Sequence, residues 1–141
     1  MERDEKVFIY QVFPRVFGNR TRSCVKHGSL QQNGSGKFDD FTPAALKAIK
    51  DFGITHVWYT GVIEHATKTD YTIFGISKDH DAVVKGKAGS PYAIKDYYDV
   101  TPDLARDIPN RMAEFEALVD RTHQAGLKVI IDFVPNHVAR Q

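Results

Sequence analysis

Apolar residues concentrate in three short runs, Val7–Phe13, Thr55–Thr60 and Leu127–Val134, which read VFIYQVF, THVWYT and LKVIIDFV. Each run has the length of a β-strand and is rich in β-branched and aromatic residues. None alternates cleanly between apolar and polar positions, which is typical of strands covered on both faces, as in a parallel sheet. The pattern therefore predicts three buried parallel strands.

Two segments between these runs have helical periodicity. Thr42–Phe52 places Ala45, Leu46, Ile49 and Phe52 on one face, with Thr42 as N-cap, Pro43 in the first turn and Gly53 as the stop. Asn110–Ala125 carries an apolar stripe and ends before Gly126, and the stripe consists of Met112, Phe115, Leu118, Val119 and Thr122.

The order β-α-β-α-β implies parallel strands joined by helical crossovers. Both long connections, Pro14–Asp40 and Gly61–Pro109, leave the C-terminal ends of strands, where α/β folds build their sites. A doubly wound sheet and the first part of a (β/α)8 barrel both fit. The Gly-Ser-Gly at 34–36 lies deep in a long loop, so the dinucleotide-binding fingerprint is absent.

Composition narrows the class of protein. The 141 residues are 42% hydrophobic and 26% charged with a net charge of +1, which predicts one domain and no nucleic-acid or membrane partner. The single cysteine, Cys24, allows no internal disulfide. The charged start lacks a signal peptide and no run could span a membrane, so we expect a cytoplasmic protein, or a periplasmic or secreted one if a leader was removed.

Polar residues close the third run. Asp132 follows the buried Val129–Ile131, and such a carboxylate needs hydrogen bonds or a charged partner. Asn136 has an oxygen suited to a calcium ion, and His137 could donate to a sugar hydroxyl. In the alternative interpretation, Asp132 and Asn136 only satisfy loop backbone.

A second cluster lies in Ser90–Leu104, SPYAIKDYYDVTPDL. It interleaves tyrosines with aspartates, a combination that suits carbohydrate, because sugar C–H faces pack on aromatic rings while carboxylates accept from hydroxyls. Alternatively, the rings cover the core. The residues are Tyr92, Tyr97, Tyr98, Asp96, Asp99 and Asp103. By contrast, we expect Glu64, Asp79 and Asp81 to be solvated or bonded locally.

Four segments together resemble the α-amylase family, glycoside hydrolase family 13. VFIYQVFPRVF is similar to its first barrel strand and FGITHVWYTGVIEHA to the segment ending its second. PYAIKDYYDV is similar to its tyrosine-bearing loop, and GLKVIIDFVPNHV to its first conserved region, D-x-x-x-N-H, at the end of the third strand. The resemblance implies the N-terminal portion, strands 1–3 with about two helices, of a TIM (β/α)8 barrel.

The resemblance also implies residue roles. Tyr92 would stack on the sugar at the cleaved position, and His137 would hydrogen-bond the same sugar. Asp132 would organise the site, Asp96 would hold the tyrosine loop, and Asn136 would bind a structural calcium ion. The sequence departs from the family at Ser90-Pro91 and at Thr60-Gly61-Val62, which leaves specificity open.

The family cleaves α-glucosidic bonds with retention, using a nucleophile after its fourth strand and an acid/base after its fifth. We therefore expect residues 1–141 to be a partial catalytic domain, cut after the third strand, with no catalytic residue before Gln141. It would be inactive alone and would need the rest of the barrel for a closed fold. The complete protein would hydrolyse α-1,4-glucans such as starch and maltooligosaccharides. Alternatives are a transglycosylating or isomerising relative of the trehalose synthase or amylosucrase type, and a non-catalytic binding or assembly member.

Overall fold

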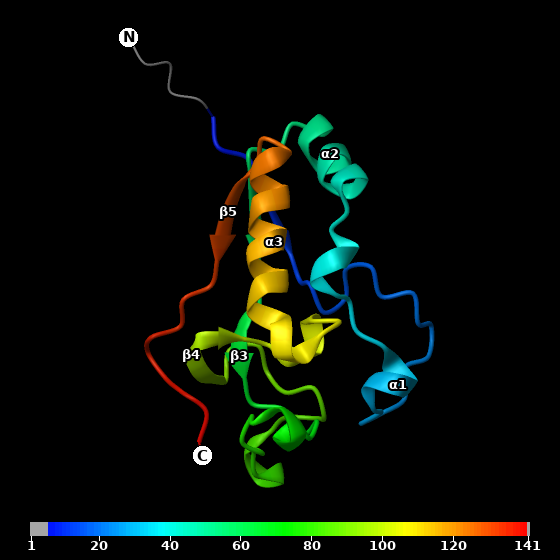
Figure 1. The fold of residues 1–141 in the computed structure, drawn as a ribbon, viewed down its shortest axis with the longest axis vertical. Helices are drawn as coiled ribbons and strands as arrows, with labels where there is room; N and C mark the ends of the chain where they lie inside the picture. The colour runs from blue at the N-terminus through cyan, green and yellow to red at the C-terminus, as the bar shows by residue number, and fades with distance from the viewer. Residues whose placement is uncertain (1–5, 141) are drawn as a thin grey trace.

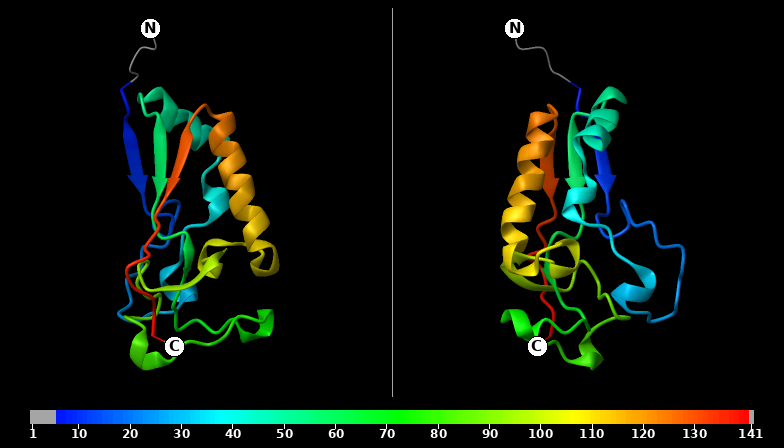
Figure 2. Two further views of the ribbon diagram at one scale, coloured as in Figure 1. Left: turned by 90° about the vertical axis from the view of Figure 1, so that its left-hand side faces the viewer. Right: turned by 45° about the vertical axis from the view of Figure 1, so that its right-hand side comes forward.

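A three-stranded parallel sheet organises the computed structural model, which describes residues 6–140 (Figure 1). Its order is β1 (Ile9–Val12), β2 (His56–Tyr59), β5 (Lys128–Ile131). The three strands end level, because Val12 pairs with Tyr59 and Tyr59 with Ile131. All three predicted strands are confirmed, each shorter than its apolar run. The level ends direct the segments that follow β1, β2 and β5 toward the same end of the molecule (Figure 2).

The two predicted helices are also confirmed, as α2 (Pro43–Asp51) and α3 (Arg111–Gln124). The Thr42 side chain accepts a hydrogen bond from the backbone N–H of Ala45 at 3.2 Å, as expected of an N-cap. Gly53 and Gly126 follow the helices at φ +94° and +74°, a left-handed conformation that suits glycine. Figure 2 shows both helices on the same side of the sheet.

The core fills the space between these helices and the sheet. At its centre the hydroxyl of Tyr59 and that of Thr122, both buried, lie 2.7 Å apart. The ring of Phe41 stacks on Phe17 and meets Tyr59 edge-on. The fully buried large side chains of the cluster include Phe38, Phe41, Leu46, Val57, Tyr59, Leu104, Leu118 and Leu127.

Burial differs from the sequence expectation at the edges of this core. The side strands are open: Ile9 is 49% and Ile131 41% exposed, so only β2 is well covered. Phe52 and Met112 were expected on the inner helix faces but are exposed. Phe52 caps the C-terminus of α2, and Met112 lies in the first turn of α3. Within residues 6–140, neither edge of the sheet has a further strand.

The long second connection contains structure that the sequence did not reveal. β3 (Ile63–His65) pairs antiparallel with β4 (Ile94–Val100), with irregular register. A short helix, α1 (Leu30–Asn33), interrupts the first connection. Single 3-10 turns occupy Phe38–Asp40, Thr72–Phe74, Asp81–Val83, Pro102–Leu104 and Ile108–Asn110. No helix within residues 6–140 combines the length and the apolar character that crossing a bilayer requires.

Candidate functional site

Asp132 lies immediately after β5 and binds the end of β2. Its Oδ1 accepts from the indole Nε1–H of Trp58 at 2.7 Å, and its Oδ2 accepts from the backbone N–H of Gly61 at 3.3 Å. Both carboxylate oxygens are therefore satisfied, as the position at a strand end requires. The side chain fixes the relation between the β5 exit and the β2 exit.

Gly61 allows the segment that contains Pro91 to approach the ends of β2 and β5. Its φ is +76°, and a Cβ there would lie 2.8 Å from Cβ of Pro91 and 2.9 Å from the ring of Phe13. The positive φ and these close contacts both favour glycine at this position. The close approach places Pro91, and with it the neighbouring Tyr92, beside the strand ends. The Tyr92 side chain is 45% exposed, so its ring is available to a ligand.

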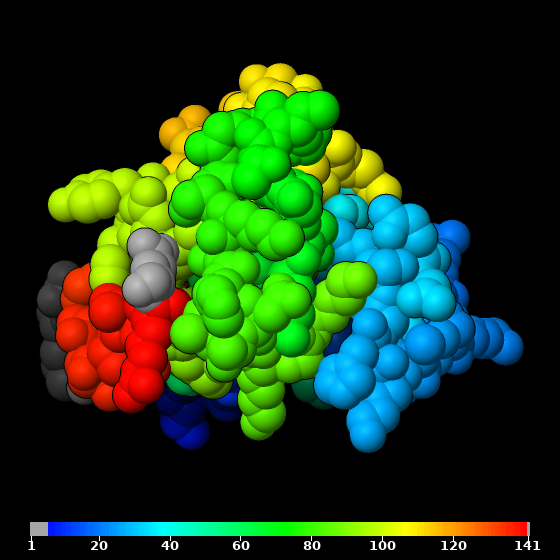
Figure 3. All heavy atoms as spheres, turned by 90° about the horizontal axis from the view of Figure 1, so that it is seen from below, coloured from blue at the N-terminus to red at the C-terminus, as the bar shows by residue number. Residues whose placement is uncertain are grey.

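The segment after Asp132 runs alongside β4. The Tyr97 hydroxyl contacts the carbonyl oxygens of Val134 and His137, and its ring lies 5.7 Å from that of Phe133. The backbone N–H of Ala139 donates to the carbonyl of Ile94 at 2.8 Å. These contacts bring residues 134–139 next to the tyrosine loop, where the side chains of Asn136 and His137 are exposed. Figure 3 views this end of the molecule, with the C-terminal segment in red beside the green second connection.

The aspartates of the tyrosine loop have three different environments. Asp96 is exposed and accepts from the backbone N–H of Tyr98 at 2.8 Å, a local turn contact. Asp99 pairs with the guanidinium of Arg111. Asp103 is 1% exposed, so the expectation that it lies among ligand-facing carboxylates is wrong.

Asp103 belongs instead to the interior. Its Oδ1 accepts from the Tyr71 hydroxyl, while its Oδ2 has no hydrogen-bond partner among the described residues. Burial raises the pKa of Asp103, and the nearby charges of Arg15 and Lys37 oppose that effect.

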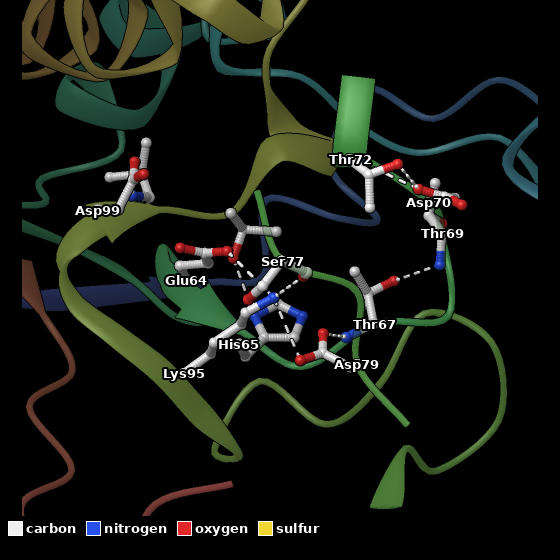
Figure 4. Close-up of polar contacts among 12 residues, drawn as sticks. Glu64, His65, Thr67, Thr69, Asp70, Thr72, Ser77, Asp79, Lys95 and Asp99 are labelled. Carbon is white, nitrogen blue, oxygen red and sulfur yellow. Dashed lines mark hydrogen bonds and ion pairs between the residues drawn. The ribbon is translucent and has the colours of Figure 1, made fainter. Parts of the chain in front are cut away.

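A second polar cluster lies beside the antiparallel pair of β3 and β4 (Figure 4). The Lys95 ammonium lies 3.2 Å from Oδ1 of Asp79 and 3.9 Å from Oε1 of Glu64, and it donates to the carbonyl of Ser77. Oδ2 of Asp79 accepts from the backbone N–H of Thr67 at 2.9 Å. Glu64 is 4% and Asp79 7% exposed, so neither side chain is solvated, and of the two expected alternatives Asp79 has the hydrogen-bonded one. Asp81 is exposed as expected.

Glu64 has an unusual electrostatic environment. Burial raises its pKa to about 7, with the positive charge of Lys95 acting against the shift and Asp99 and Asp96 adding to it. It faces a polar pocket of about 300 Å³ whose charged lining residues are Glu64, Lys95, Asp96, Asp99 and Arg111.

The calcium ion that the resemblance implies would find only part of a ligand set among the described side chains. Calcium takes six to eight oxygen ligands. Asn136 supplies one amide oxygen, and residues 6–140 contain no group of three or more His, Cys, Asp or Glu side chains arranged to hold a metal ion.

Sequence reasoning missed two interior residues, Arg15 and His65. The Arg15 guanidinium contacts the His65 ring, with Nη2 lying 2.7 Å from Nε2, and His65 is 1% exposed. A signal existed only for Arg15, which lies three residues after a strand. Nothing in the run VIEHA distinguishes a buried histidine from a solvated one.

Parallel strands ending level, helical crossovers and polar side chains at the strand C-termini are typical of α/β folds that build their sites at that end of the sheet, the (β/α)8 barrel among them. The model of the α-amylase catalytic domain matches residues 11–141, and the chain belongs to that family. The predicted family and fold class are thereby confirmed.

Known relatives span several activities. Maltase 1 of Drosophila virilis is 30% identical over 105 residues, covering 74% of this chain and 12% of that protein. The amino acid transporter heavy chain SLC3A1 of Mus musculus is 29% identical, covering 93% of this chain and 14% of that protein. The crystal structure of Bacillus licheniformis trehalose-6-phosphate hydrolase aligns with a TM-score of 0.59 at 26% identity, covering 94% of this chain and 17% of that one. The chain thus spans well under a quarter of each.

Proposed function

We propose that residues 1–141 form part of a catalytic barrel domain and that the protein carrying them is a retaining glycosidase acting on α-1,4-glucans such as starch and maltooligosaccharides. The supporting observation is the convergence of Asp132, the tyrosine loop and the 134–139 segment at the C-terminal end of the sheet. Residues of all four segments that resemble the family meet there. Relatives named as maltases and α-glucosidases support the same class of activity.

In this proposal each side chain has a role that its contacts permit. The exposed ring of Tyr92 offers a face for a glucose unit, and the exposed His137 offers a donor for one of its hydroxyls. Both oxygens of Asp132 bind groups at the end of β2, the indole of Trp58 and the backbone N–H of Gly61, so we assign it a structural role and not that of the nucleophile. It organises the strand ends on which the sugar would lie. The nucleophile and the acid/base would come from residues outside this chain.

The test measures hydrolysis and its stereochemistry in the protein that carries this chain. We expect release of reducing sugar from maltoheptaose, with NMR showing the α-anomer first, because the family mechanism retains configuration. Tyr92→Ala should raise KM about tenfold or more, whereas Tyr98→Ala, which removes a 93% exposed ring from β4 in the same loop, should leave it unchanged. First appearance of the β-anomer, or equal kinetics for the two variants, would contradict the proposal.

A transglycosylating or isomerising enzyme of the trehalose synthase or amylosucrase type is the second candidate in the same class. It is supported by similarity to a cyclomaltodextrin glucanotransferase of Geobacillus stearothermophilus, 29% identical over 141 residues. The same NMR experiment distinguishes it, because new glucosidic linkages would then appear in place of free reducing ends.

A non-catalytic member is the third candidate, and similarity to the amino acid transporter heavy chain supports it. Such a protein would bind or assemble without turnover. Binding of maltoheptaose without any product over long incubation would favour this candidate.

Binding of a structural calcium ion, which the resemblance to the family implies, remains a proposal. Asn136 would supply one ligand, and the remaining ligands would have to come from outside the described residues. Isothermal titration of residues 1–141 with calcium chloride should therefore show no binding at submillimolar concentration, while the protein that carries them should bind one ion. Submillimolar binding to residues 1–141 would contradict this.

A further inference from the structure

The side chain of Arg15 joins three segments that are far apart in the sequence. Arg15 follows β1, and its Nη1 donates to the carbonyl of Gly89 at 3.1 Å while its Nη2 donates to the carbonyl of Ala88 at 3.0 Å. The same Nη2 lies 2.7 Å from Nε2 of His65 in β3. The guanidinium also lies over the ring of Phe13, 5.1 Å from its centroid. Both terminal nitrogens of the guanidinium are therefore bound to other groups of the protein.

The contacts of His65 determine which ring nitrogen carries the proton. The hydroxyl of Thr101 donates to the carbonyl of Ile63 at 3.0 Å, so it is an acceptor for Nδ1 of His65, 2.8 Å away. Nδ1 also lies 3.4 Å from the Ile63 carbonyl, which can only accept. Nδ1 is therefore protonated and Nε2 accepts from Arg15. Burial, followed by the charge of Arg15, lowers the pKa of His65 to about 4, so the ring stays a neutral acceptor at neutral pH.

The turn that Arg15 holds is docked closely on the exit of β3. Gly89 has φ +76°, and a Cβ there would lie 1.8 Å from the carbonyl oxygen of Ala66. The backbone N–H of Ala66 donates to the carbonyl of Ala93 at 3.0 Å, and that of Lys68 to the carbonyl of Lys87 at 2.9 Å. Residues 87–93 are therefore held on both flanks by backbone hydrogen bonds and at Ala88 and Gly89 by Arg15. Tyr92 lies within this segment.

We propose that Arg15, oriented by His65, is a positioning residue that fixes the Tyr92-bearing turn against the ends of β1 and β2. What Tyr92 then binds rests on the proposed function. Neither Arg15 nor His65 touches the sugar. Arg15 acts by holding two carbonyl groups of the turn, so that the ring of Tyr92 is already in place when a glucose unit arrives.

A first experiment measures the docking of the turn without any ligand. The variants are Arg15→Gln and the milder Arg15→Lys, which keeps the charge but cannot reach both carbonyls and the imidazole in a fork geometry. Arg22→Gln, at an exposed position of the same connection, is the matched control. Amide hydrogen exchange is followed by NMR at Ala66 and Lys68, whose acceptors lie in the docked segment, and at Leu118 in α3.

We expect exchange at Ala66 and Lys68 to rise at least about tenfold in both Arg15 variants, with Leu118 unchanged. In Arg15→Gln the NMR titration of His65 should also move to higher pH, because a neighbouring positive charge is removed. Unchanged exchange at Ala66 and Lys68 in Arg15→Lys would overturn the proposal. Arg15→Lys also keeps the test decisive if Arg15→Gln fails to fold.

A second experiment connects the turn to the ligand, in the protein that carries this chain. Arg15→Lys should raise KM for maltoheptaose about tenfold with a smaller effect on kcat, and the double variant with Tyr92→Ala should be no worse than Tyr92→Ala alone. Additive effects would overturn the link between Arg15 and Tyr92. Absence of glucan binding by the unaltered protein would refute the proposed function, while hydrogen exchange would still decide whether Arg15 positions the turn.

Discussion

Replacing Glu64 with glutamine should make the stability of the chain less dependent on pH. Glu64 is 4% exposed as a residue, and its carboxyl group lines the polar pocket beside β4. The nearest opposite charge is the Lys95 ammonium at 3.9 Å. Burial raises the pKa of Glu64 in the folded protein to about 7 from an ordinary value of 4.5, the value expected in the unfolded chain.

The sign of the effect follows from proton binding. Between pH 4.5 and about 7 the folded protein holds a proton on Glu64 that the unfolded chain has released. The free energy of unfolding therefore falls as the pH rises through this window, and the contribution of the proton is lost above it. The full pKa difference corresponds to about 3 kcal/mol. Because the carboxyl group faces an open polar pocket that screens its charge, we expect about 1–2 kcal/mol.

Urea unfolding of the protein that carries this chain, followed by circular dichroism at several pH values between about 5 and 8, measures this difference. Relative to the unaltered chain, Glu64→Gln should gain about 1–2 kcal/mol in stability as the pH is raised across this range. Glu116→Gln, an exposed position on α3, is the control and should follow the unaltered chain. Parallel pH profiles for the chain and Glu64→Gln would refute the reasoning.

Three further predictions concern the core and residues 1–141 as an isolated polypeptide. Tyr59→Phe should cost about 1–2 kcal/mol in urea unfolding by removing the buried contact with Thr122, and a double-mutant cycle with Thr122→Val should show coupling; strict additivity would contradict this. Open edges at β1 and β5 should make the polypeptide self-associate in size-exclusion chromatography with light scattering, whereas a compact monomer that unfolds cooperatively would count against it. It should release no reducing sugar from maltoheptaose, because we expect the family's catalytic carboxylates to follow later strands of the barrel; measurable hydrolysis by pure polypeptide would disprove this.

Regular elements were predictable wherever local chemistry decides them. The cap at Thr42, the proline after it and the glycines at 53 and 126 mark α2 and the end of α3, because each stabilises a helix end irrespective of distant contacts. The pair β3 and β4 was not predictable. β3 has three residues, two of them polar and buried, and its partner begins 29 residues later. Its stability comes from pairing across the loop, which no local pattern reports.

In the candidate site, too, some features could be predicted from residue type and others depended on distant contacts. A carboxylate ending a buried strand must find donors, so a bonded Asp132 was foreseeable from residue type alone. Its donors were not, because the indole of Trp58 and the backbone N–H of Gly61 reach it only through the register of β2 against β5. Likewise, the exposed Tyr92, Asn136 and His137 could be identified by resemblance, but their proximity rests on contacts of Tyr97 and Ala139 with the neighbouring segment.

Buried polar side chains, rather than an apolar core of its own, hold the second connection in place. Arg15, His65 and Lys95 each bridge segments at least 16 residues apart, through contacts that are wholly or partly shielded from solvent. Contacts of this kind are directional and costly to leave unpaired, so they specify one arrangement of a loop too short to build a separate hydrophobic core. Sequence patterns cannot reveal them, because a polar residue in a loop looks solvated until its partner is known. Because these contacts are directional, single substitutions far from any ligand should displace the tyrosine loop. Arg15→Lys tests this most directly, because it keeps the charge and removes only the geometry of the contacts.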